Sequence, residues 1–467
     1  MRGARGCGAA KFAYLGVYRY LVDLLAAVEP GQRIKLPSLR ALARQLSVSV
    51  STAQAAYTLL ETEGRIQSVA KSGYFAEGPA AFPPALHGSD LLQRMLASAC
   101  QPTIRTFSRG APAADIVAVG QLFRLEAQLA RRYPAGLVEV AQPCGELELR
   151  RVLAARYTRS LRDYWSADDV YIGADFSAVL DMTWTALELK DAVVAVLAPC
   201  PWRMLRTLQC AGAQVVELAL DPGEKFPLQR LQALFSRYQV RVMVLGSSFL
   251  WPLGMALSDA EKRGIARLLE RQGVWVVEDD TQGDLAMRPG VRFRELVDPQ
   301  RLLVLGSLQY SLGAEAPFAY LLSRHRRVEL QRLCLQRSIL PPPLRHKALA
   351  RFIDTGSYDA HITRLIARVQ PQVTARAITL RTALDEHLHL TVPAGGATLW
   401  AAARQPVDMR SVFETLRLQG FLIAPGDIFS LQGHCQHHLR LDATRHDQDT
   451  FEQMLVALGG ALQRHRL

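Results

Sequence analysis

Lysine and arginine side chains that could neutralise phosphate groups are concentrated at the start of this chain. Residues 1–76 contain ten Lys or Arg and four Asp or Glu, a net charge of +6, whereas all 467 residues together carry +12. Half of the excess positive charge therefore lies in about a sixth of the sequence. This distribution is typical of a domain that binds the backbone of nucleic acid. A basic surface that only keeps the protein in solution has the same composition, so charge alone leaves both interpretations open.

A second group of residues has the side-chain types that bind metal ions. His434, Cys435, His437 and His438 lie within five residues of one another in the run GHCQHH. No acidic partner is evident, and surface histidines are common, so we predict no metal site here. The seven cysteines are dispersed and form no CxxC pair, which indicates reduced thiols in a cytoplasm rather than a disulfide framework.

Apolar residues at helical spacing predict the elements that would position a nucleic-acid contact. One helix is expected over residues 12–28 and another over residues 39–46, where Ser38 can cap the first turn. A third helix over residues 51–63 follows a tight turn, capped by Ser49 or Ser51. Two short strands on either side of Lys71-Ser72-Gly73 would then form a hairpin. Two short helices joined by a tight turn are the helix-turn-helix pattern, and the hairpin is its wing.

This pattern resembles the winged-helix domain of GntR-type transcription regulators. The residues that carry the resemblance are Leu36, Pro37, Ser38, Arg40, Leu42, Ala43, Val48, Ser49, Thr52, Ala56, Tyr57, Leu60, Gly64, Ser72 and Gly73. In such proteins the second helix of the motif lies in the major groove of double-stranded DNA. The residues expected to contact an operator are Ser51, Thr52 and Gln54 at the bases and Arg40, Lys71 and Gly73 at the backbone. The family often has arginine at the start of this helix, where this chain has Val50, so the base preference is not predicted.

Composition divides the chain into three regions. Residues 1–76 form the predicted DNA-binding domain, and residues 77–99 form a linker rich in Pro, Ala and Gly followed by a connecting helix over residues 89–99. In residues 100–467, continuous apolar runs that predict strands alternate with amphipathic helices, such as the one expected over residues 259–272. The predicted strands cover residues 192–199, 214–220, 240–248, 274–280 and 301–307. This alternation predicts an α/β domain with a mostly parallel sheet, followed from about residue 350 by a small C-terminal α+β lobe.

The order of these elements resembles the fold-type I aminotransferases. The whole chain resembles the MocR subgroup of GntR regulators, which fuse a winged helix to such a domain and form homodimers. The residues that carry this resemblance are Gly145-Glu146-Leu147, Leu149-Arg150, Pro252, Gly254, Glu278-Asp279-Asp280, Gly306-Ser307, Pro425-Gly426, Phe429 and Leu439-Arg440-Leu441.

The same resemblance raises the question of the cofactor pyridoxal phosphate (PLP), which a lysine must hold as a Schiff base. The segment 304–322 reads VLGSLQYSLGAEAPFAYLL. Aligned on Gly306-Ser307, it has Tyr310 where the lysine belongs and Pro317 where the phosphate-binding arginine belongs. No lysine lies between Lys262 and Lys347. Tyrosine cannot form an imine, so we do not expect covalent PLP, and we predict that the domain is not an enzyme.

Two further departures point the same way. Thr281 stands where the regulators usually have tyrosine, and Asp175 stands in the loop that should hold the phosphate, where its charge would repel that group. Asp279 and Arg440 remain where the resemblance places the partners of the pyridine nitrogen and of the substrate carboxylate. Trp202 and Trp251 could stack on a ring.

These residues allow two interpretations. Asp279, Tyr310, Arg440, Trp202 and Trp251 could line a remodelled pocket for a carboxylate or cationic effector. Alternatively, the charged residues persist in structural contacts and the tryptophans pack in the core.

We therefore predict a cytoplasmic, homodimeric, DNA-binding transcription regulator whose aminotransferase-like domain serves dimerisation and effector sensing. The alternatives are a regulator that responds to PLP bound without a covalent bond, and a PLP-dependent aminotransferase with an unusual site. No run of about 18 apolar residues and no secretion-signal pattern occurs, so we expect no membrane span and no export. The operator, the regulated genes, the direction of regulation and the effector are not specified.

Overall fold

The chain forms two compact units, residues 1–83 and 84–467. The computed structural model describes residues 13–26, 33–62, 66–69, 72–77, 89–112, 116–132, 142–160, 163–221, 223–288, 290–337 and 343–467. Each unit has a hydrophobic core of its own. None of the described helices combines the length and the apolar composition that crossing a bilayer requires.

The first unit is a winged helix-turn-helix. Its elements are α1 (Ala13–Ala26), β1 (Arg33–Lys35), α2 (Leu39–Gln45), α3 (Val50–Thr62), β2 (Gln67–Val69) and β3 (Gly73–Glu77). The strands form an antiparallel sheet in the order β1-β3-β2. The third helix begins at Val50, one residue earlier than predicted, because Ser49 rather than Ser51 accepts the backbone hydrogen bond from Thr52 (3.1 Å).

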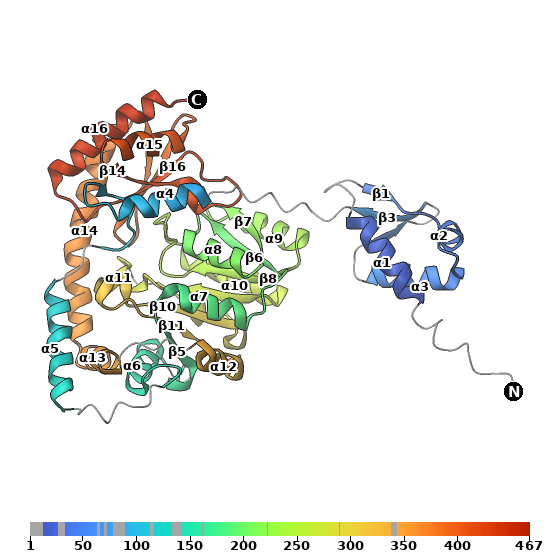
Figure 1. Cartoon of the computed structure of the whole chain (residues 1–467), viewed down its shortest axis with the longest axis horizontal. Coiled ribbons are helices and arrows are strands. Elements are labelled where there is room, and N and C mark those ends of the chain that lie inside the picture. The colour runs from blue at the N-terminus through green and yellow to red at the C-terminus, as the bar shows by residue number, and fades with distance from the viewer. Residues whose placement is uncertain are drawn as a thin grey trace. The chain divides into compact units, whose positions relative to one another are not determined.

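A mixed, mostly parallel sheet forms the centre of the second unit (Figure 1). In the described part of the chain its order is β5-β11-β10-β9-β8-β6-β7, and β11 alone runs antiparallel to its neighbours. The strands are β5 (Val170–Gly173), β6 (Val193–Ala198), β7 (Gln214–Ala219), β8 (Val240–Gly246), β9 (Trp275–Asp279), β10 (Leu302–Ser307) and β11 (Ala319–Leu322). This α/β architecture confirms the predicted fold class.

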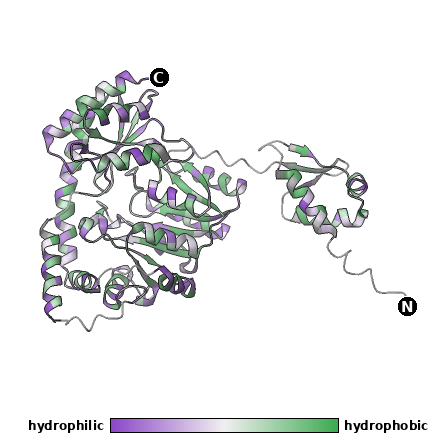
Figure 2. Ribbon diagram, in the orientation of Figure 1, coloured by the Kyte–Doolittle hydropathy of each residue, from purple (hydrophilic) through white to green (hydrophobic). Residues whose placement is uncertain are grey.

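Helices of this unit bury their apolar faces on the sheet. Figure 2 shows the strands as mostly hydrophobic ribbons and the helices as mixed ones. One core cluster joins the strands to α7 (Phe176–Ala186), α8 (Trp202–Cys210) and α12 (Arg327–Arg337). The remaining helices before the C-terminal lobe are α4 (Ser89–Ala99), α5 (Ile116–Arg132), α6 (Leu147–Tyr157), α9 (Leu228–Arg237), α10 (Asp259–Gln272), α11 (Gln309–Leu312) and α13 (Pro343–Asp354).

Local signals in the sequence explain where helices stop and start. Helix α10 spans the range predicted from its periodicity, because Ser258 and Glu261 form a capping box at its start. Gly273 ends it in the left-handed conformation (φ 64°), which glycine adopts without strain. Helix α4 also spans its predicted range and belongs to the second unit, where Arg94 pairs with Glu414 (2.8 Å).

The C-terminal lobe follows the long helix α14 (Ser357–Leu384), which contains Pro371. Its sheet has the order β12-β13-β16-β15. The elements of the lobe are β12 (Leu388–Thr391), β13 (Thr398–Ala403), α15 (Met409–Leu418), β14 (Phe421–Leu422), β15 (Ala424–Pro425), β16 (His438–Asp442) and α16 (Gln448–Arg464). Strand β14 pairs in parallel with β4 (Arg105–Thr106), so a segment from the start of the unit is part of this lobe.

Candidate DNA interface and ligand pocket

The outward face of α3 is the part of the first unit that can meet base edges. Val50, Ser51 and Gln54 are exposed at its N-terminal end. The opposite face of the helix is buried in the core through Ala53, Ala56, Tyr57 and Leu60. The Tyr57 hydroxyl donates to the carbonyl of Pro37 (2.7 Å), and burial raises the pKa of that phenol to about 12. Tyr57 is therefore part of the scaffold that holds α3 against α2.

Hydroxyl groups at the start of α3 bind one another. Ser49 Oγ lies 2.8 Å from Ser51 Oγ and 2.7 Å from Thr52 Oγ1. Of the residues predicted to contact bases, Ser51 and Gln54 are exposed and Thr52 is half-buried. Gln54 is the one whose side chain has no hydrogen-bond partner among the described residues.

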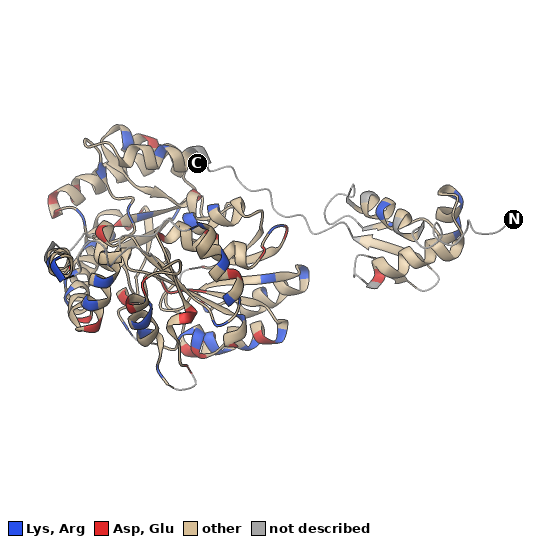
Figure 3. Cartoon of the chain, turned by 60° about the horizontal axis from the view of Figure 1, so that its bottom comes forward, with Lys and Arg blue, Asp and Glu red and all other residues tan. Residues whose placement is uncertain are grey.

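Basic and glycine residues flank this helix on two other elements. Arg40 is exposed on α2, and Gly73 is exposed at the start of β3 with φ of 108°. The side chain of Lys35 passes beside Gly73, since a Cβ on that glycine would lie 3.5 Å from Lys35 Cε. Sequence reasoning did not select Lys35, because only the pairing of β1 with β3 brings it to the wing. Lys71 lies outside the described residues. Among the described positions of this unit, basic residues outnumber acidic ones (Figure 3).

The second candidate site lies at the carboxyl ends of β9 and β10. Asp279 is the last residue of β9, and its Oδ1 accepts from the backbone (3.1 Å) and hydroxyl (2.6 Å) of Thr281. Tyr310 lies in α11, shortly after β10. Its side chain is half-buried and lies close enough to Asp279, Arg203 and Arg440 to interact with their charges. Burial raises the pKa of Asp279 despite the bonds from Thr281, and it also raises the pKa of the Tyr310 phenol.

Arg440 reaches the same region from β16 of the C-terminal lobe. Its side chain is buried, and its guanidinium lies 4.9 Å from the ring centroids of both Trp251 and Phe429. Nη2 donates to the Ser108 carbonyl, and in the described structure Nε and Nη1 have no hydrogen-bond partner. Burial lowers the pKa of Arg440 to about 10, which still leaves it charged at neutral pH. A cation with unpaired donors could bind an anion that enters beside it.

Trp251 fills the space over that guanidinium. A Cβ at Gly110 would lie 2.6 Å from Trp251 Cζ2, so the indole can take this position only because residue 110 has no side chain. The ring centroid of Tyr310 lies 6.3 Å from that of Trp251. The structure therefore brings Asp279, Tyr310, Arg440 and Trp251 together.

A pocket opens beside Asp279 between β6, β8 and the loops that follow β8 and β9. Its polar lining comes from Ser248, Asp279, Thr281 and Gln282, and its apolar wall includes Phe249 and Trp251. Within the described residues, both side-chain amide atoms of Gln282 and the indole Nε1 of Trp251 are buried without a partner. Sequence reasoning missed Gln282, because only the backbone turn after β9 shows which way it points. Trp202 is the first residue of α8, and its ring centroid lies 5.1 Å from Arg203 Cζ. Trp202 does not line the pocket.

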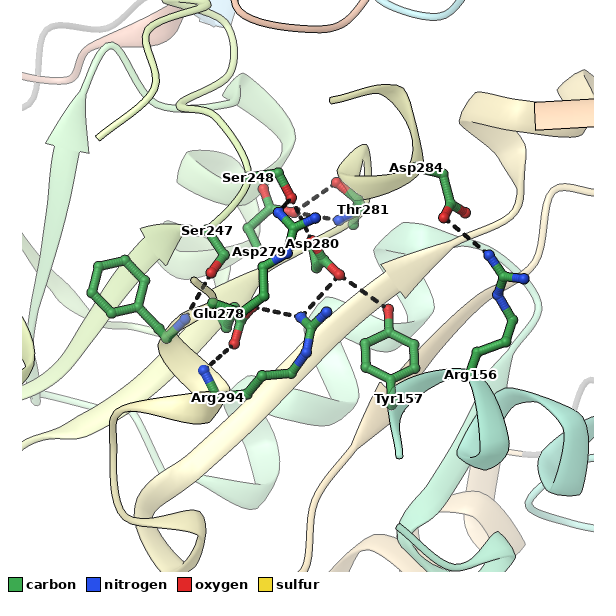
Figure 4. A network of polar contacts seen from close by, with 12 residues as sticks. Arg156, Tyr157, Ser247, Ser248, Glu278, Asp279, Asp280, Thr281, Asp284 and Arg294 are labelled. Atoms are coloured by element: carbon green, nitrogen blue, oxygen red, sulfur yellow. Dashed lines mark hydrogen bonds and ion pairs between the residues drawn. The ribbon is translucent and has the colours of Figure 1, made fainter. Parts of the chain in front are cut away.

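A buried ion network holds β9 in place under this pocket (Figure 4). Arg294 Nη1 binds Glu278 Oε1 (2.6 Å) and Asp280 Oδ2 (2.9 Å). Ser248 and Tyr157 also donate to Asp280, at 2.9 and 3.4 Å. Arg294 holds both neighbours of Asp279 in the sequence, Glu278 and Asp280, so the backbone at Asp279 has little freedom to move.

The start of α7 carries its own negative charge. Asp175 Oδ1 accepts from the backbone N–H of Ala178 (2.7 Å) and caps the helix. Backbone N–H groups at a helix N-terminus are a common site for phosphate, and here a carboxylate already occupies one of them.

Lysine side chains of the second unit lie away from the pocket. The unit contains Lys190, Lys225, Lys262 and Lys347, none of which lines the pocket at Asp279. Lys262 Nζ donates to the Val291 carbonyl (2.8 Å), and Lys347 Nζ pairs with Glu146 (3.1 Å) and Glu148 (2.7 Å). Lys190 and Lys225 are exposed.

The histidine and cysteine run before β16 has structural contacts. His438 stacks on Trp400 with ring centroids 5.5 Å apart, His437 Nδ1 lies 2.9 Å from the Val407 carbonyl, and Cys435 is buried. No group of three or more metal-binding side chains occurs within the described ranges of the chain.

Two protein families match this chain. Residues 13–75 match the bacterial regulatory proteins of the gntR family, and residues 135–458 match class I and II aminotransferases. Among curated proteins, the uncharacterized HTH-type transcriptional regulator YjiR of Escherichia coli K12 is 27% identical, with 96% of this chain and 99% of YjiR covered. The probable rhizopine catabolism regulatory protein MocR of Rhizobium meliloti is 24% identical, with 71% of this chain and 69% of MocR covered.

The solved structures add evidence on the fold. The crystal structure of a multiple substrate aminotransferase from Thermococcus profundus superposes with a TM-score of 0.71, covering 80% of this chain and 94% of that one. The two sequences are 17% identical, so this likeness concerns the fold alone.

Proposed function

This chain belongs to the class I and II aminotransferase family and is an HTH-type transcription regulator of the MocR/GntR type, and from this premise we propose that its aminotransferase-like domain has lost transaminase activity. On this proposal the protein acts in the cytoplasm as a homodimer on an operator. The large domain then serves dimerisation and the sensing of a small effector.

The arrangement around Asp279 and Tyr310 carries the proposal. A phenol lies directly after β10 and close to Asp279, and none of the four lysines of the unit lines the pocket there. A Schiff base needs an amine at this place, and tyrosine has none to offer.

Two more features do not fit a covalently bound PLP. Asp175 caps α7, so a phosphate at that helix start would meet a carboxylate. Pro317 has neither a charge nor a backbone N–H to offer to a phosphate. We therefore propose that the pocket binds a small molecule other than PLP.

The effector site that we propose is formed by Asp279, Tyr310, Arg440 and Trp251, whereas Trp202 lies outside the lining of the pocket. Its unpaired groups support this assignment, because a ligand would satisfy buried donors and acceptors that otherwise cost free energy. Gln282 and Trp251 supply such groups next to the Asp279 carboxylate, and Arg440 supplies two unpaired guanidinium nitrogens. A bound molecule would favour one of two arrangements of the regulator and so change its affinity for DNA.

Titration of the full-length protein with PLP tests the loss of the aldimine. Visible absorbance would be followed during the titration, and borohydride trapping with peptide mapping would identify any lysine that reacts. We expect no saturable aldimine band and at most scattered labelling of surface lysines. A saturable band, with one lysine trapped in the pocket, would refute the proposal.

A further inference from the structure

The reading face of α3 has an unusual composition for a helix that contacts DNA. Its 13 residues, VSTAQAAYTLLET, include no lysine and no arginine. Arginine or lysine bound to O6 and N7 of guanine is the commonest specific contact in the major groove. This helix must therefore distinguish bases with amide, hydroxyl or methyl groups.

Two side chains remain available at the end of α3 that enters the groove. Val50 is the first residue of the helix and is 45% exposed, although it is an apolar, branched residue. Gln54 is exposed one helical turn later, so both lie on the same face. The hydroxyls of Ser51 and Thr52 are less available, because both already bind Ser49 Oγ.

The chemistry of these two groups matches one base pair. A glutamine amide can donate to adenine N7 and accept from adenine N6, and an apolar side chain can contact the C5 methyl group of thymine. We propose that α3 reads A·T pairs, with Gln54 on an adenine and Val50 on the methyl group of a thymine in the same or the neighbouring pair. This inference rests on the proposed DNA-binding function and goes beyond it by naming the bases and the residues that read them.

Selection of binding sites from a random duplex library by the full-length protein supplies the DNA for the test. We expect the enriched sites to carry A·T pairs at the positions that α3 contacts. Thymine would then be replaced by deoxyuridine, which lacks only the methyl group, and adenine by 7-deazaadenine, which lacks the N7 acceptor.

Each analogue should act through one residue. Loss of the thymine methyl should weaken binding about fourfold in the wild type, and it should have no effect in Val50→Ala. Loss of adenine N7 should weaken binding by about 5-fold or more in the wild type, and it should have no effect in Gln54→Leu. Val50→Arg should shift the selected sites towards guanine.

Val456→Ala is the matched control, since Val456 is a 79% exposed valine on α16 of the other unit. It should keep both discriminations. Enriched sites with G·C pairs under α3, or equal sensitivity to deoxyuridine in the wild type and Val50→Ala, would overturn the A·T assignment while leaving DNA binding intact. Failure to enrich any duplex would overturn both proposals.

Discussion

Arg440 shows how single residues decide what the second unit can bind. Its guanidinium is enclosed by the rings of Trp251 and Phe429, and Gly110 leaves room for the indole. Cation–π contacts of this kind stabilise a desolvated charge. The same rings restrict the guanidinium to ligands that can reach Nε and Nη1 past the indole. Arg440 is therefore the residue type expected to bind a substrate carboxylate, but a carboxylate could reach it only by displacing the rings of Trp251 or Phe429.

Restoring the missing amine alone should not restore the enzyme. We expect Tyr310→Lys to show neither a stable aldimine band with PLP nor transamination of an amino acid, because Asp175 and Pro317 still leave the phosphate without a site. Absorbance and a coupled turnover assay would measure this, with Tyr310→Phe as the control for the changed side chain. Measurable turnover in Tyr310→Lys would contradict the remodelled-pocket interpretation.

His346 should make the stability of the second unit depend on pH. Its ring is 1% exposed on α13, Nδ1 accepts from the backbone of Glu146 (3.3 Å), and burial lowers its pKa from 6.5 to about 4. Below pH 6.5 the unfolded chain binds a proton that the folded chain does not, so stability falls as pH drops from 6.5 towards 4. Between pH 7 and pH 5 the loss from this residue should be about 2 kcal/mol.

Urea unfolding at several pH values would measure this dependence. His346→Asn keeps an acceptor near the Nδ1 position, and it should make the loss of stability between pH 7 and pH 5 smaller by about 2 kcal/mol. An unchanged slope would show that His346 does not titrate as its burial implies.

Among the structural elements, the N-terminal caps of α3 and α7 affect what each helix can bind. Ser49 caps α3 and leaves Val50 and Gln54 to face outwards, whereas Asp175 caps α7 with a charge. Both caps satisfy backbone N–H groups that the helix itself cannot. In α7 the cap also adds a negative charge at the place where the family resemblance implies a phosphate.

Removal of the α7 cap should destabilise the second unit. We expect Asp175→Ala to lower its free energy of unfolding by about 1 kcal/mol, because the N–H of Ala178 loses its acceptor. Asp175→Asn can still cap the helix, so its free energy of unfolding should stay within roughly 0.3 kcal/mol of the wild-type value. Chemical unfolding followed by circular dichroism would compare the two variants. Equal losses in both would mean that charge rather than capping is what Asp175 contributes.

The whole molecule consists of two units, each with its own hydrophobic core, and the two suit different tasks of a regulator. The described basic side chains of the first unit and the face of α3 suit DNA. The second unit has the aminotransferase fold and a pocket in which the side-chain amide of Gln282 and the indole Nε1 of Trp251 lack partners among the described residues. If an effector bound in the second unit regulates the first, it must do so by changing the affinity of the regulator for its operator.

Salt dependence should show which basic residues contact phosphates. We expect Arg40→Ala to weaken binding to all duplexes about equally and to reduce the slope of log K against log salt concentration by about 0.9. Arg230→Ala removes an arginine that is 52% exposed on the second unit and serves as the control. An Arg40→Ala variant with the slope of the wild type would remove Arg40 from the docking geometry.

Local chemistry made much of the fold predictable. Helices α4 and α10 span their predicted ranges, α2 ends one residue before its predicted end, and α3 begins one residue before its predicted start. Caps, turn residues and apolar spacing act within a few residues, which makes these limits predictable. Strands β5 and β11 were not predicted. They are short, and β11 runs against its neighbours, so only pairing with distant strands identifies them.

Residue types and their spacing were enough to predict the winged helix, the α/β class of the larger unit and the presence of Tyr310 rather than lysine after β10. These features depend on residue type and short-range periodicity, which the chain carries in every conformation. Three features depend on the folded chain: Trp251 covers Arg440, the amide of Gln282 is buried without a partner at the pocket, and Lys35 lies beside Gly73 at the wing. Each of these contacts joins residues or elements whose directions are set by sheet pairing and core packing, and no local signal encodes them.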